Sequence, residues 1–443
     1  MRIGVMRLGV MERMFVAWAL LALGCNGEGP DGKGTDPSTT SEPTTEPTGT
    51  TVDAPTFADD VLPLVASSCG QCHGPSGLGP LDLLDYDVAS TWAEVLLDRI
   101  DAGEMPPPTA DPDCHPYQGM DETRLDPALG DTLARWIETG LQPGDLDSAP
   151  PVEIWSPPAL SRRDVELRPP AGVSPQFVEG NEYRCFLVDD IEEDTWVSGL
   201  EFLIDHPQIS HHAVLFVDPN GGSEQRITDA ASRSWTCPSV QPEPNWEMIH
   251  AWAPSGGAVE FPEGMGLRVP AGSQIVLQMH YWEGADGIVD LPGYALKLSD
   301  AVDREMYYAP VGPDRFTIPA GEASHSETMS LPMFLLGGGA WEVFGVMPHM
   351  HVLGTGYDFR GTTSGGADKC ISRSDAYDFA LQPTYWFDEP VRLEASDRIE
   401  VTCTWDNSAS NPRQLNDPPQ DVTWGEYTQQ EMCYALMYIA QAQ

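Results

Sequence analysis

Residues 274–282 read Gln-Ile-Val-Leu-Gln-Met-His-Tyr-Trp, and residues 210–217 read Ser-His-His-Ala-Val-Leu-Phe-Val. Both are short runs rich in β-branched and apolar residues, which favours strands over helices. Similar runs recur from residue 159 onward, separated by Pro-Gly, Asn-Gly and Gly-Gly turns; examples are Ala213–Val217, Gln274–Tyr281, Tyr294–Leu298 and Arg398–Thr404. This pattern is typical of β-sandwiches, and the length suffices for two, which we place at residues 159–303 and 304–443.

The chain before residue 159 follows a different pattern. Residues 56–147 are expected to be mostly helical, because apolar residues recur at helical spacing. Two segments, 90–101 and 126–141, each place a set of apolar residues on one face: Trp92, Val95, Leu96 and Ile100 in the first, and Leu129, Leu133, Trp136 and Ile137 in the second. A short helix is expected to begin at Thr56, and the Pro-rich residues 142–158 predict a linker.

The segment Cys69-Gly70-Gln71-Cys72-His73 is a haem-attachment signature. In such a motif two thiols form thioethers with the haem and the adjacent histidine reaches the iron. Cys69 and Cys72 would therefore carry the haem, and His73 would be its proximal ligand. A zinc half-site is the alternative, but the sequence offers only Cys114-His115 in place of a second cysteine pair.

A methionine further along, Met105, is followed by three prolines that restrict its loop. This arrangement, with a closing helix that bears Trp136 and ends near Gly140, resembles small bacterial c-type cytochromes. The resemblance implies a small all-α cytochrome c domain over residues 56–147, with Met105 as the distal haem ligand. A Met/His pair raises the reduction potential and closes the iron to oxygen, so the domain would carry electrons. The alternative is that Met105 is an ordinary buried loop residue.

The N-terminus predicts export. Three arginines precede a ten-residue apolar stretch, 14–23, which is too short to span a bilayer and is typical of a signal peptide. It ends at Cys25 in a sequence that resembles a bacterial lipobox, so residues 1–25 are interpreted as a lipoprotein signal with Cys25 lipidated. Residues 26–55, rich in Thr, Pro and Gly, predict a flexible tether. We expect an exported lipoprotein of the bacterial cell envelope, in the periplasm or at the outer membrane; secretion without lipid is the alternative.

The charge balance narrows the choice of partners. With 23 basic and 68 acidic residues the formal charge is -45, which argues against nucleic acid as a partner and limits membrane contact to the lipid anchor. A solvated acidic surface explains this charge, and steering of cationic partners is the alternative.

Five of the ten histidines and one methionine fall in four short segments that suggest copper ligands: His211, His212, His280, His349, His351 and Met432. Imidazole binds copper in either oxidation state, and thioether sulfur favours Cu(I). An H-x-H pair on a strand places both rings on one face, whereas adjacent histidines share a metal only at a strand end or bulge. Met350, between the paired histidines, is expected in the core. His206, His250 and His325 are not assigned.

The order of these segments, HH, then Gln-x-His-Tyr, then H-x-H, then Glu-Met-Cys, resembles the ascorbate-dependent type II copper monooxygenases over about residues 160–440. The resemblance implies two jelly-roll-like copper domains facing each other across a solvent cleft. One would hold copper with His211, His212 and His280; the other, with His349, His351 and Met432, would bind oxygen and catalyse. It also implies the disulfides Cys185–Cys237 and Cys403–Cys433. The pairing of Cys114 and Cys370 is left open.

The expected function is therefore hydroxylation of a C–H bond in a small organic substrate with O2. Electrons would come through haem c, with ascorbate, another external reductant or a redox donor protein as further sources. The peptide-amidating members carry an arginine where this chain has Met347 and a tyrosine where it has Leu436, so a peptide C-terminus is not the expected substrate. The alternatives are a non-catalytic haem and copper electron-transfer or copper-binding protein, and an adhesive lipoprotein.

Overall fold

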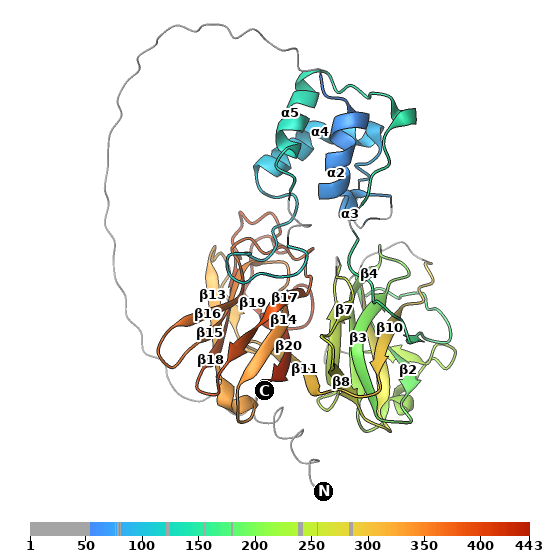
Figure 1. Ribbon diagram of the computed structural model, residues 1–443, viewed down its shortest axis with the longest axis vertical. Helices are drawn as coiled ribbons and strands as arrows, with labels where there is room; N and C mark the ends of the chain where they lie inside the picture. The colour runs from blue at the N-terminus through green and yellow to red at the C-terminus, as the bar shows by residue number, and fades with distance from the viewer. Residues whose placement is uncertain are drawn as a thin grey trace.

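The computed structural model (Figure 1) describes residues 54–443 except 76, 78, 80, 121–124, 155, 179, 238–241, 255 and 283–286. The predicted signal segment with Cys25, and all but the last two residues of the predicted tether, lie outside the described residues. Within the part of the chain that is described, no helix is both long and apolar enough to cross a bilayer.

The helices gather near the N-terminus: η1 (Phe57–Val61), α2 (Leu62–Ser68), α3 (Gly70–His73), α4 (Tyr86–Asp101), α5 (Leu129–Glu138) and the turn η2 (Leu146–Ser148). The predicted start is confirmed, since Thr56 caps η1 by accepting a hydrogen bond from the Asp59 amide. Helix α5 buries three of the four residues expected on its apolar face. Helix α4 differs, because Ala89, Ala93 and Leu96 are its buried residues.

Trp92 and Val95 of α4 are 42% and 43% exposed, so the face predicted for this helix is wrong in part. Small alanines allow α4 to approach its neighbours closely, and the larger apolar side chains are left outside.

The strands follow from residue 165 onward: β1 (Val165–Leu167), β2 (Asn181–Asp190), β3 (Thr195–Leu203), β4 (Ser210–Asp218), β5 (Ser234–Thr236), β6 (Glu247–Trp252), β7 (Val259–Glu260), β8 (Met265–Val269), β9 (Gln274–Trp282), β10 (Gly293–Ser299), β11 (Arg304–Val311), β12 (Thr317–Ile318), β13 (His325–Pro332), β14 (Trp341–His349), β15 (Gly354–Thr362), β16 (Asp368–Ser374), β17 (Tyr385–Leu393), β18 (Arg398–Trp405), β19 (Val422–Thr423) and β20 (Tyr434–Gln441). The turns η3 (Ser223–Arg226) and η4 (Met333–Leu336) interrupt them. The four strands predicted as examples are confirmed as β4, β9, β10 and β18.

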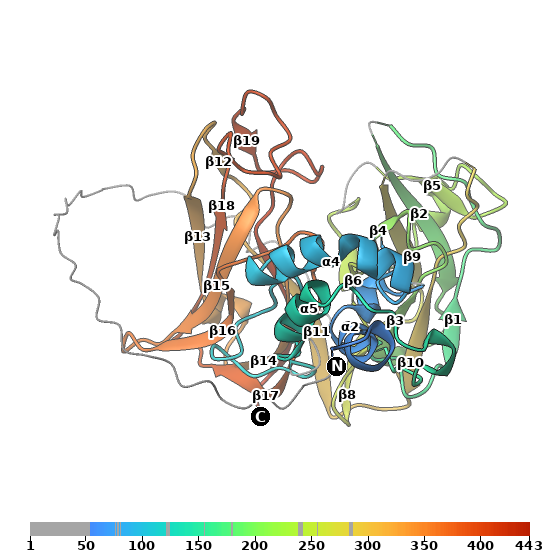
Figure 2. The same ribbon diagram turned by 90° about the horizontal axis from the view of Figure 1, so that it is seen from above.

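These strands form two β units, visible side by side in Figures 1 and 2. The first unit contains the sheet β5-β2-β9-β4-β6, and the second contains β13-β18-β15-β16. A nine-stranded sheet, β1-β10-β3-β8-β11-β20-β14-β17 with β7 on β3, runs through both. The parallel pair β8 and β11 joins its two halves, so the units share backbone hydrogen bonds.

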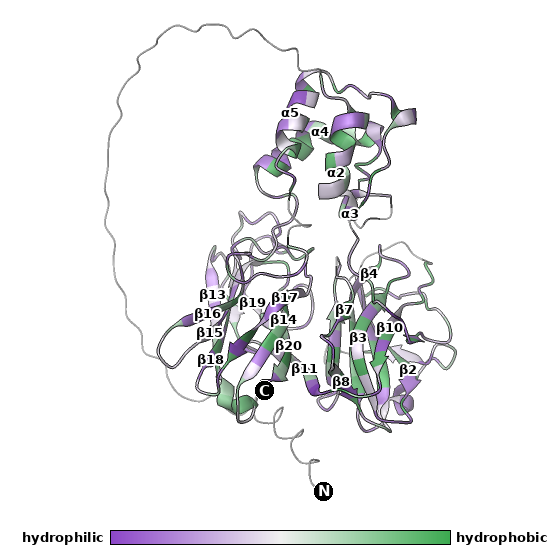
Figure 3. Cartoon of the chain, viewed as in Figure 1, coloured by the Kyte–Doolittle hydropathy of each residue, from purple (hydrophilic) through white to green (hydrophobic). Residues whose placement is uncertain are grey.

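Apolar residues run along the strands of both units (Figure 3) and fill two large cores. The first core also contains Phe344, Met347, Leu436 and Tyr438 from the second unit. Burial of these side chains between the units stabilises their contact, because each removes apolar surface from water. The two units therefore share part of one core.

The residues after α4 leave the helices and lie on the second unit. Ala110 and Tyr117 belong to its core, and Tyr117 forms a β-bridge with Phe387. The Gln118 amide donates to the Trp386 carbonyl. We call residues 109–120 the strap.

The expected fold class is wrong. The described chain is mostly β-sheet with few helices, and it presents no separate all-α cytochrome c domain. The strap explains part of the error, because residues that the sequence placed within 56–147 contribute to a β core. The helices keep a small apolar cluster of their own around Phe57, Leu133 and Trp136.

Candidate metal centre

Three histidines of the first unit converge at the ends of β4 and β9. The pairing of these strands shifts register between Ser210 and His212, which confirms the bulge or strand end expected for adjacent histidines. His212 lies opposite His280 across the ladder. The ligand nitrogens of His211, His212 and His280 all lie within 4.8 Å of one another, and the Nδ1 atoms of the first two are 3.3 Å apart.

The surroundings leave a ring nitrogen available on these histidines. His280 Nε2 lies 2.8 Å from Asn181 Oδ1, so the amide oxygen accepts from this ring and fixes its tautomer. His280 Nδ1 is then buried without a hydrogen-bond partner, as is His212 Nε2. Buried polar atoms without partners are rare in proteins. This set of imidazoles therefore fits a copper ion, which would satisfy such atoms.

The second group lies at the end of β14. The rings of His349 and His351 have centroids 5.2 Å apart. His349 Nδ1 donates to Gln382 Oε1 at 2.7 Å, and His351 Nδ1 donates to the Gln430 carbonyl at 3.0 Å. Both histidines therefore present Nε2 as the remaining ligand atom.

Glu431 and Met432 follow directly after Gln430. The Glu431 carboxylate accepts from the amides of His351 and Leu353, at 2.8 and 2.7 Å, and from the Trp405 indole at 2.9 Å. Burial nevertheless raises the pKa of Glu431 to about 7. Met432 is buried, and its backbone position is tied to His351 through Glu431. These contacts place the backbone of Met432 beside His351, and the role of Met432 as a ligand stays a prediction.

The two groups touch. The ring centroids of His212 and His349 are 5.4 Å apart. The ring centroid of Phe379 lies 5.0 Å from that of His211 and 6.0 Å from that of His351. The described side chains of the two groups are therefore in contact, with the Phe379 ring beside both, and not separated by the expected solvent cleft. Phe379 comes from the connection between β16 and β17 and gave no signal in the sequence.

All five histidines are held neutral. Burial lowers the pKa of His211 to about 4, with a smaller contribution from the charge of the neighbouring His349. Burial likewise lowers the pKa of His349 to about 4 and the pKa of His351 to about 3. Burial also holds the pKa of His212 and His280 well below the ordinary value. A neutral imidazole keeps the lone pair that a metal ion requires.

The haem-attachment motif forms one turn of helix. The His73 amide donates to the Cys69 carbonyl at 2.8 Å, and His73 Nδ1 lies 3.2 Å from the Leu81 carbonyl, which leaves Nε2 as the ligand atom. A Cβ on Gly79 would lie 2.6 Å from His73 Nδ1, so glycine allows this close approach. Attachment of a haem to Cys69 and Cys72, neither of which is in a disulfide, stays a prediction. Met105 lies in the turn after α4, where its amide donates to the Arg99 carbonyl, so its role as distal ligand stays a prediction.

Both disulfides implied by the resemblance are present, Cys185–Cys237 and Cys403–Cys433. A third, Cys114–Cys370, fastens the strap to β16. Sequence spacing could not find it, because its cysteines are 256 residues apart.

Several other residues considered in the sequence are buried in the two cores or between the units. Met350 is fully buried in the second core, which confirms the expectation. Met347 and Leu436, considered above for the substrate side, are buried in the first core. His250 is buried beside the Tyr438 hydroxyl at 2.5 Å.

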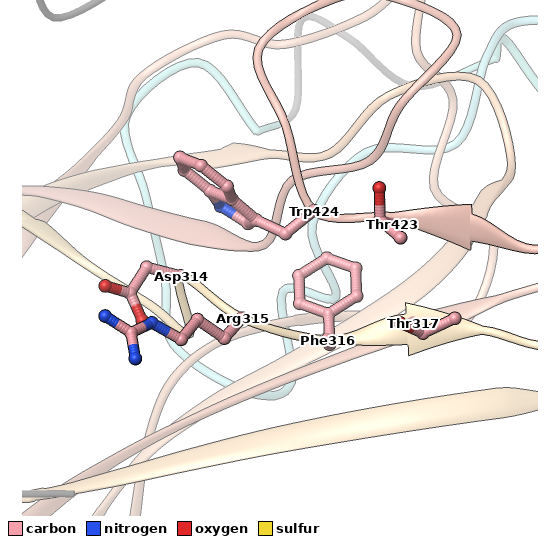
Figure 4. Close-up of a pocket in the computed structure, with 6 residues that line it drawn as sticks. All are labelled: Asp314, Arg315, Phe316, Thr317, Thr423 and Trp424. Atoms are coloured by element: carbon pink, nitrogen blue, oxygen red, sulfur yellow. The ribbon is translucent and has the colours of Figure 1, made fainter.

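A surface hollow of about 480 Å³ lies beside β12 and β19 (Figure 4). It is lined by Asp314, Arg315, Phe316, Thr317, Thr423 and Trp424. None of the described histidines of either group lines it. The hollow borders the start of the loop that carries Met432.

Comparisons with known proteins agree with this geometry. Residues 322–443 match the family described as "Copper type II ascorbate-dependent monooxygenase, C-terminal domain", and this range contains His349, His351 and Met432. The chain is also similar to "DBH-like monooxygenase protein 1" of Gallus gallus, 24% identical over 295 residues, and of Mus musculus, 26% identical over 293 residues. These matches cover 58% and 59% of this chain and 44% and 45% of the relatives.

The chain thus spans about half the length of the curated relatives it matches. A solved structure titled "Structure of PNGF-II in C2 space group" is 8% identical to this chain, and the match covers 63% of this chain and 65% of that chain. Its TM-score of 0.26 is too low to indicate a shared fold. Together, the family match and the two relatives support a relationship between this chain and the copper type II monooxygenases. The members of this family are oxidoreductases that depend on copper and ascorbate.

Proposed function

We propose that this chain is a copper-dependent monooxygenase that hydroxylates a C–H bond of a small organic substrate with O2. The observation that carries the proposal is the convergence of neutral histidines whose other ring nitrogens are engaged by Asn181, Gln382 and the Gln430 carbonyl. One group would be His211, His212 and His280, and the other His349, His351 and Met432. Copper, when bound, would supply one-electron transfer and activation of O2.

The chain's own residues would orient and shield the site. Asn181 and Gln382 hold one histidine of each group in a single orientation, which reduces the cost of ordering when a ligand binds. Gln382 is itself fixed, because its Nε2 donates to the Phe379 carbonyl at 2.8 Å. Phe379, which contacts a histidine of each group, would limit the access of water between them.

The electron supply is part of the proposal. Hydroxylation with O2 consumes two electrons and two protons, because one oxygen atom enters the substrate and the other leaves as water. Cys69, Cys72, His73 and Met105 would hold a haem, which would supply one-electron transfer. Ascorbate, another external reductant or a redox donor protein would be further sources. The chain would be exported and anchored by lipid at Cys25.

A non-catalytic haem and copper electron-transfer protein is the second candidate. The observation that favours it is the Phe379 ring, which lies between the two histidine groups, with its centroid 5.0 Å from that of His211 and 6.0 Å from that of His351. Turnover distinguishes the two candidates. A relay passes electrons to an external acceptor without incorporating oxygen, whereas a monooxygenase incorporates labelled oxygen from ¹⁸O2.

The first test is elemental analysis of copper and iron in the purified full chain after reconstitution with copper. Two coppers and one iron per chain support the proposed function and justify a substrate screen with ¹⁸O2. One copper or none contradicts the paired-copper proposal. Copper without iron removes the haem from the proposal and leaves the copper chemistry standing.

A further inference from the structure

One loop of the second unit, residues 425–432, contacts the second histidine group directly and is linked to the first group through Tyr183. Its ends are closed by a bridge between Trp424 and Glu431 and by the Gly425 amide, which donates to the Glu431 carbonyl at 3.1 Å. Inside the loop the Gln430 amide donates to the Tyr427 carbonyl at 2.8 Å. Because these hydrogen bonds join the two ends of the loop, we expect a displacement at one end to shift the other.

The C-terminal end of this loop belongs to the second histidine group. The Gln430 carbonyl accepts from His351 Nδ1, and the Glu431 carboxylate accepts from the His351 amide. Met432 follows directly. Any shift of the loop therefore changes where His351 and Met432 lie relative to each other.

The other end is held by Tyr183 of the first unit. The Tyr183 hydroxyl donates to the Glu426 carbonyl at 3.0 Å, and its ring lies 6.4 Å from that of Tyr427. The same ring stacks on His280, with centroids 4.1 Å apart and planes 5° from parallel. Tyr183 and His280 are partners across the ladder of β2 and β9, so the stack is built into the sheet.

We propose that Tyr183 is a positioning residue that couples the two histidine groups, by stacking on His280 and holding the Gly425–Met432 loop through Glu426. The assignment of copper to these groups rests on the proposed function; the contact of Tyr183 with the loop does not. Occupation of the His211, His212 and His280 group would restrain the His280 ring at Nδ1, in addition to the Asn181 contact at Nε2. Tyr183 would pass this order to the loop, so the second group would bind Cu(I) more tightly.

Two substitutions separate the two contacts of Tyr183. Tyr183→Phe keeps the stack on His280 and removes the hydroxyl, whereas Tyr183→Leu removes both. Tyr281→Phe is the matched control. Tyr281 follows His280 in β9, and its buried hydroxyl donates to Asp290. This hydroxyl makes none of the loop contacts described above. All three variants are first checked for folding by thermal unfolding.

Amide hydrogen exchange of the metal-free protein is the first measurement. In Tyr183→Phe the amides of residues 425–432 should exchange about 2- to 10-fold faster than in the wild type, the range expected when one hydrogen bond is lost. Tyr281→Phe should leave this loop unchanged. Equal loop exchange in the wild type and Tyr183→Phe overturns the positioning role, whatever the copper content.

Competitive Cu(I) titration then tests the coupling. In the wild type, filling the first group should tighten the second about 5-fold or more, a typical coupling between sites. Both Tyr183 variants should lose this dependence while still binding copper at each group. If the wild type binds two coppers independently, the coupling is wrong and the proposed function stands. If it binds no second copper, the proposed function fails, while the exchange result still decides the role of Tyr183.

Discussion

The imidazole rings of His212 and His349 have centroids 5.4 Å apart, although the two residues belong to different β units. The continuous sheet through β8 and β11 and the shared core around Tyr438 hold the units close enough for this contact. The two histidine groups therefore form one cluster, and Phe379 decides how open that cluster is.

Phe379→Ala should open the space between the groups. We expect two coppers per chain as in the wild type, but faster and tighter binding of azide to the Cu(II) form, because water and small anions gain access. The loss of unfolding free energy should stay below the about 3–5 kcal/mol typical of fully buried phenylalanines, since Phe379 is partly exposed. Azide titration followed by absorption measures the effect. Phe379→Leu, which keeps most of the volume, is the control; identical azide binding in all three proteins would contradict the occluding role.

Met432→Ala should remove a sulfur ligand from the second group. X-ray absorption of the Cu(I) protein should lose its copper–sulfur contribution, and hydroxylation should fall below the wild-type rate. Met350→Ala is a matched control, because Met350 lies between the paired histidines yet is buried in the second core. It should cost about 2–5 kcal/mol of stability and keep the copper–sulfur signal. Hydroxylation at the wild-type rate in Met432→Ala would exclude this ligand.

The strands and the ligand-bearing segments could be predicted from local patterns. β9 is an apolar run bounded by turn residues, and the adjacent histidines of β4 required a bulge, which the register shows. These features depend on residues near one another in sequence.

The features that sequence did not reveal depend on contacts between distant segments. Asn181 meets His280 across 99 residues, and Asp111 pairs with Arg373 across 262. The strap was assigned to a helical region because its residues carry no pattern of their own, and its place is set by the core that receives Tyr117.

Asn181→Ala should weaken copper binding at the first group about 10- to 100-fold, the usual effect of losing a residue that orients a metal-bound histidine. Without the Asn181 oxygen, the His280 ring can rotate or change tautomer, which costs order when copper binds. Competition with a Cu(I) chelator measures the affinity. Gln382→Ala should weaken the second group by a similar factor and the first group less, so each variant is the control for the other. Equal weakening of both groups by either variant would point to general loss of structure.

Asp290 should make stability depend on pH. It is buried, Tyr281 donates to its Oδ2 at 2.9 Å, and burial raises its pKa from 3.8 to about 6. The folded protein therefore holds this proton more tightly than the unfolded chain. The resulting stabilisation is fully present below about pH 4 and is lost as the pH rises through about 6, by at most about 3 kcal/mol.

Asp290→Asn cannot ionise and should lack this loss. Urea unfolding at pH 4 and 7 should show the free energy of the wild type falling relative to the variant over this interval. Asp300→Asn, an exposed substitution with the same change of charge, controls for net charge. A constant difference between wild type and Asp290→Asn across the interval would disprove the raised pKa.

The Cys114–Cys370 disulfide should hold the strap, and with it the helices, on the second β unit. The strap also has an Asp111–Arg373 ion pair, and the His115 ring lies 2.8 Å from the Glu389 carbonyl, so it should remain partly docked when the disulfide is removed. The double variant Cys114→Ser/Cys370→Ser should lose about 2–4 kcal/mol of stability and show faster amide exchange in residues 109–120. Exchange in β4 and β9 should not change, because the strap contacts described above are all with the second unit. Adding Arg373→Gln to the double variant should increase strap exchange further. Unchanged strap exchange in the double variant would mean that core packing of Tyr117 alone holds this segment.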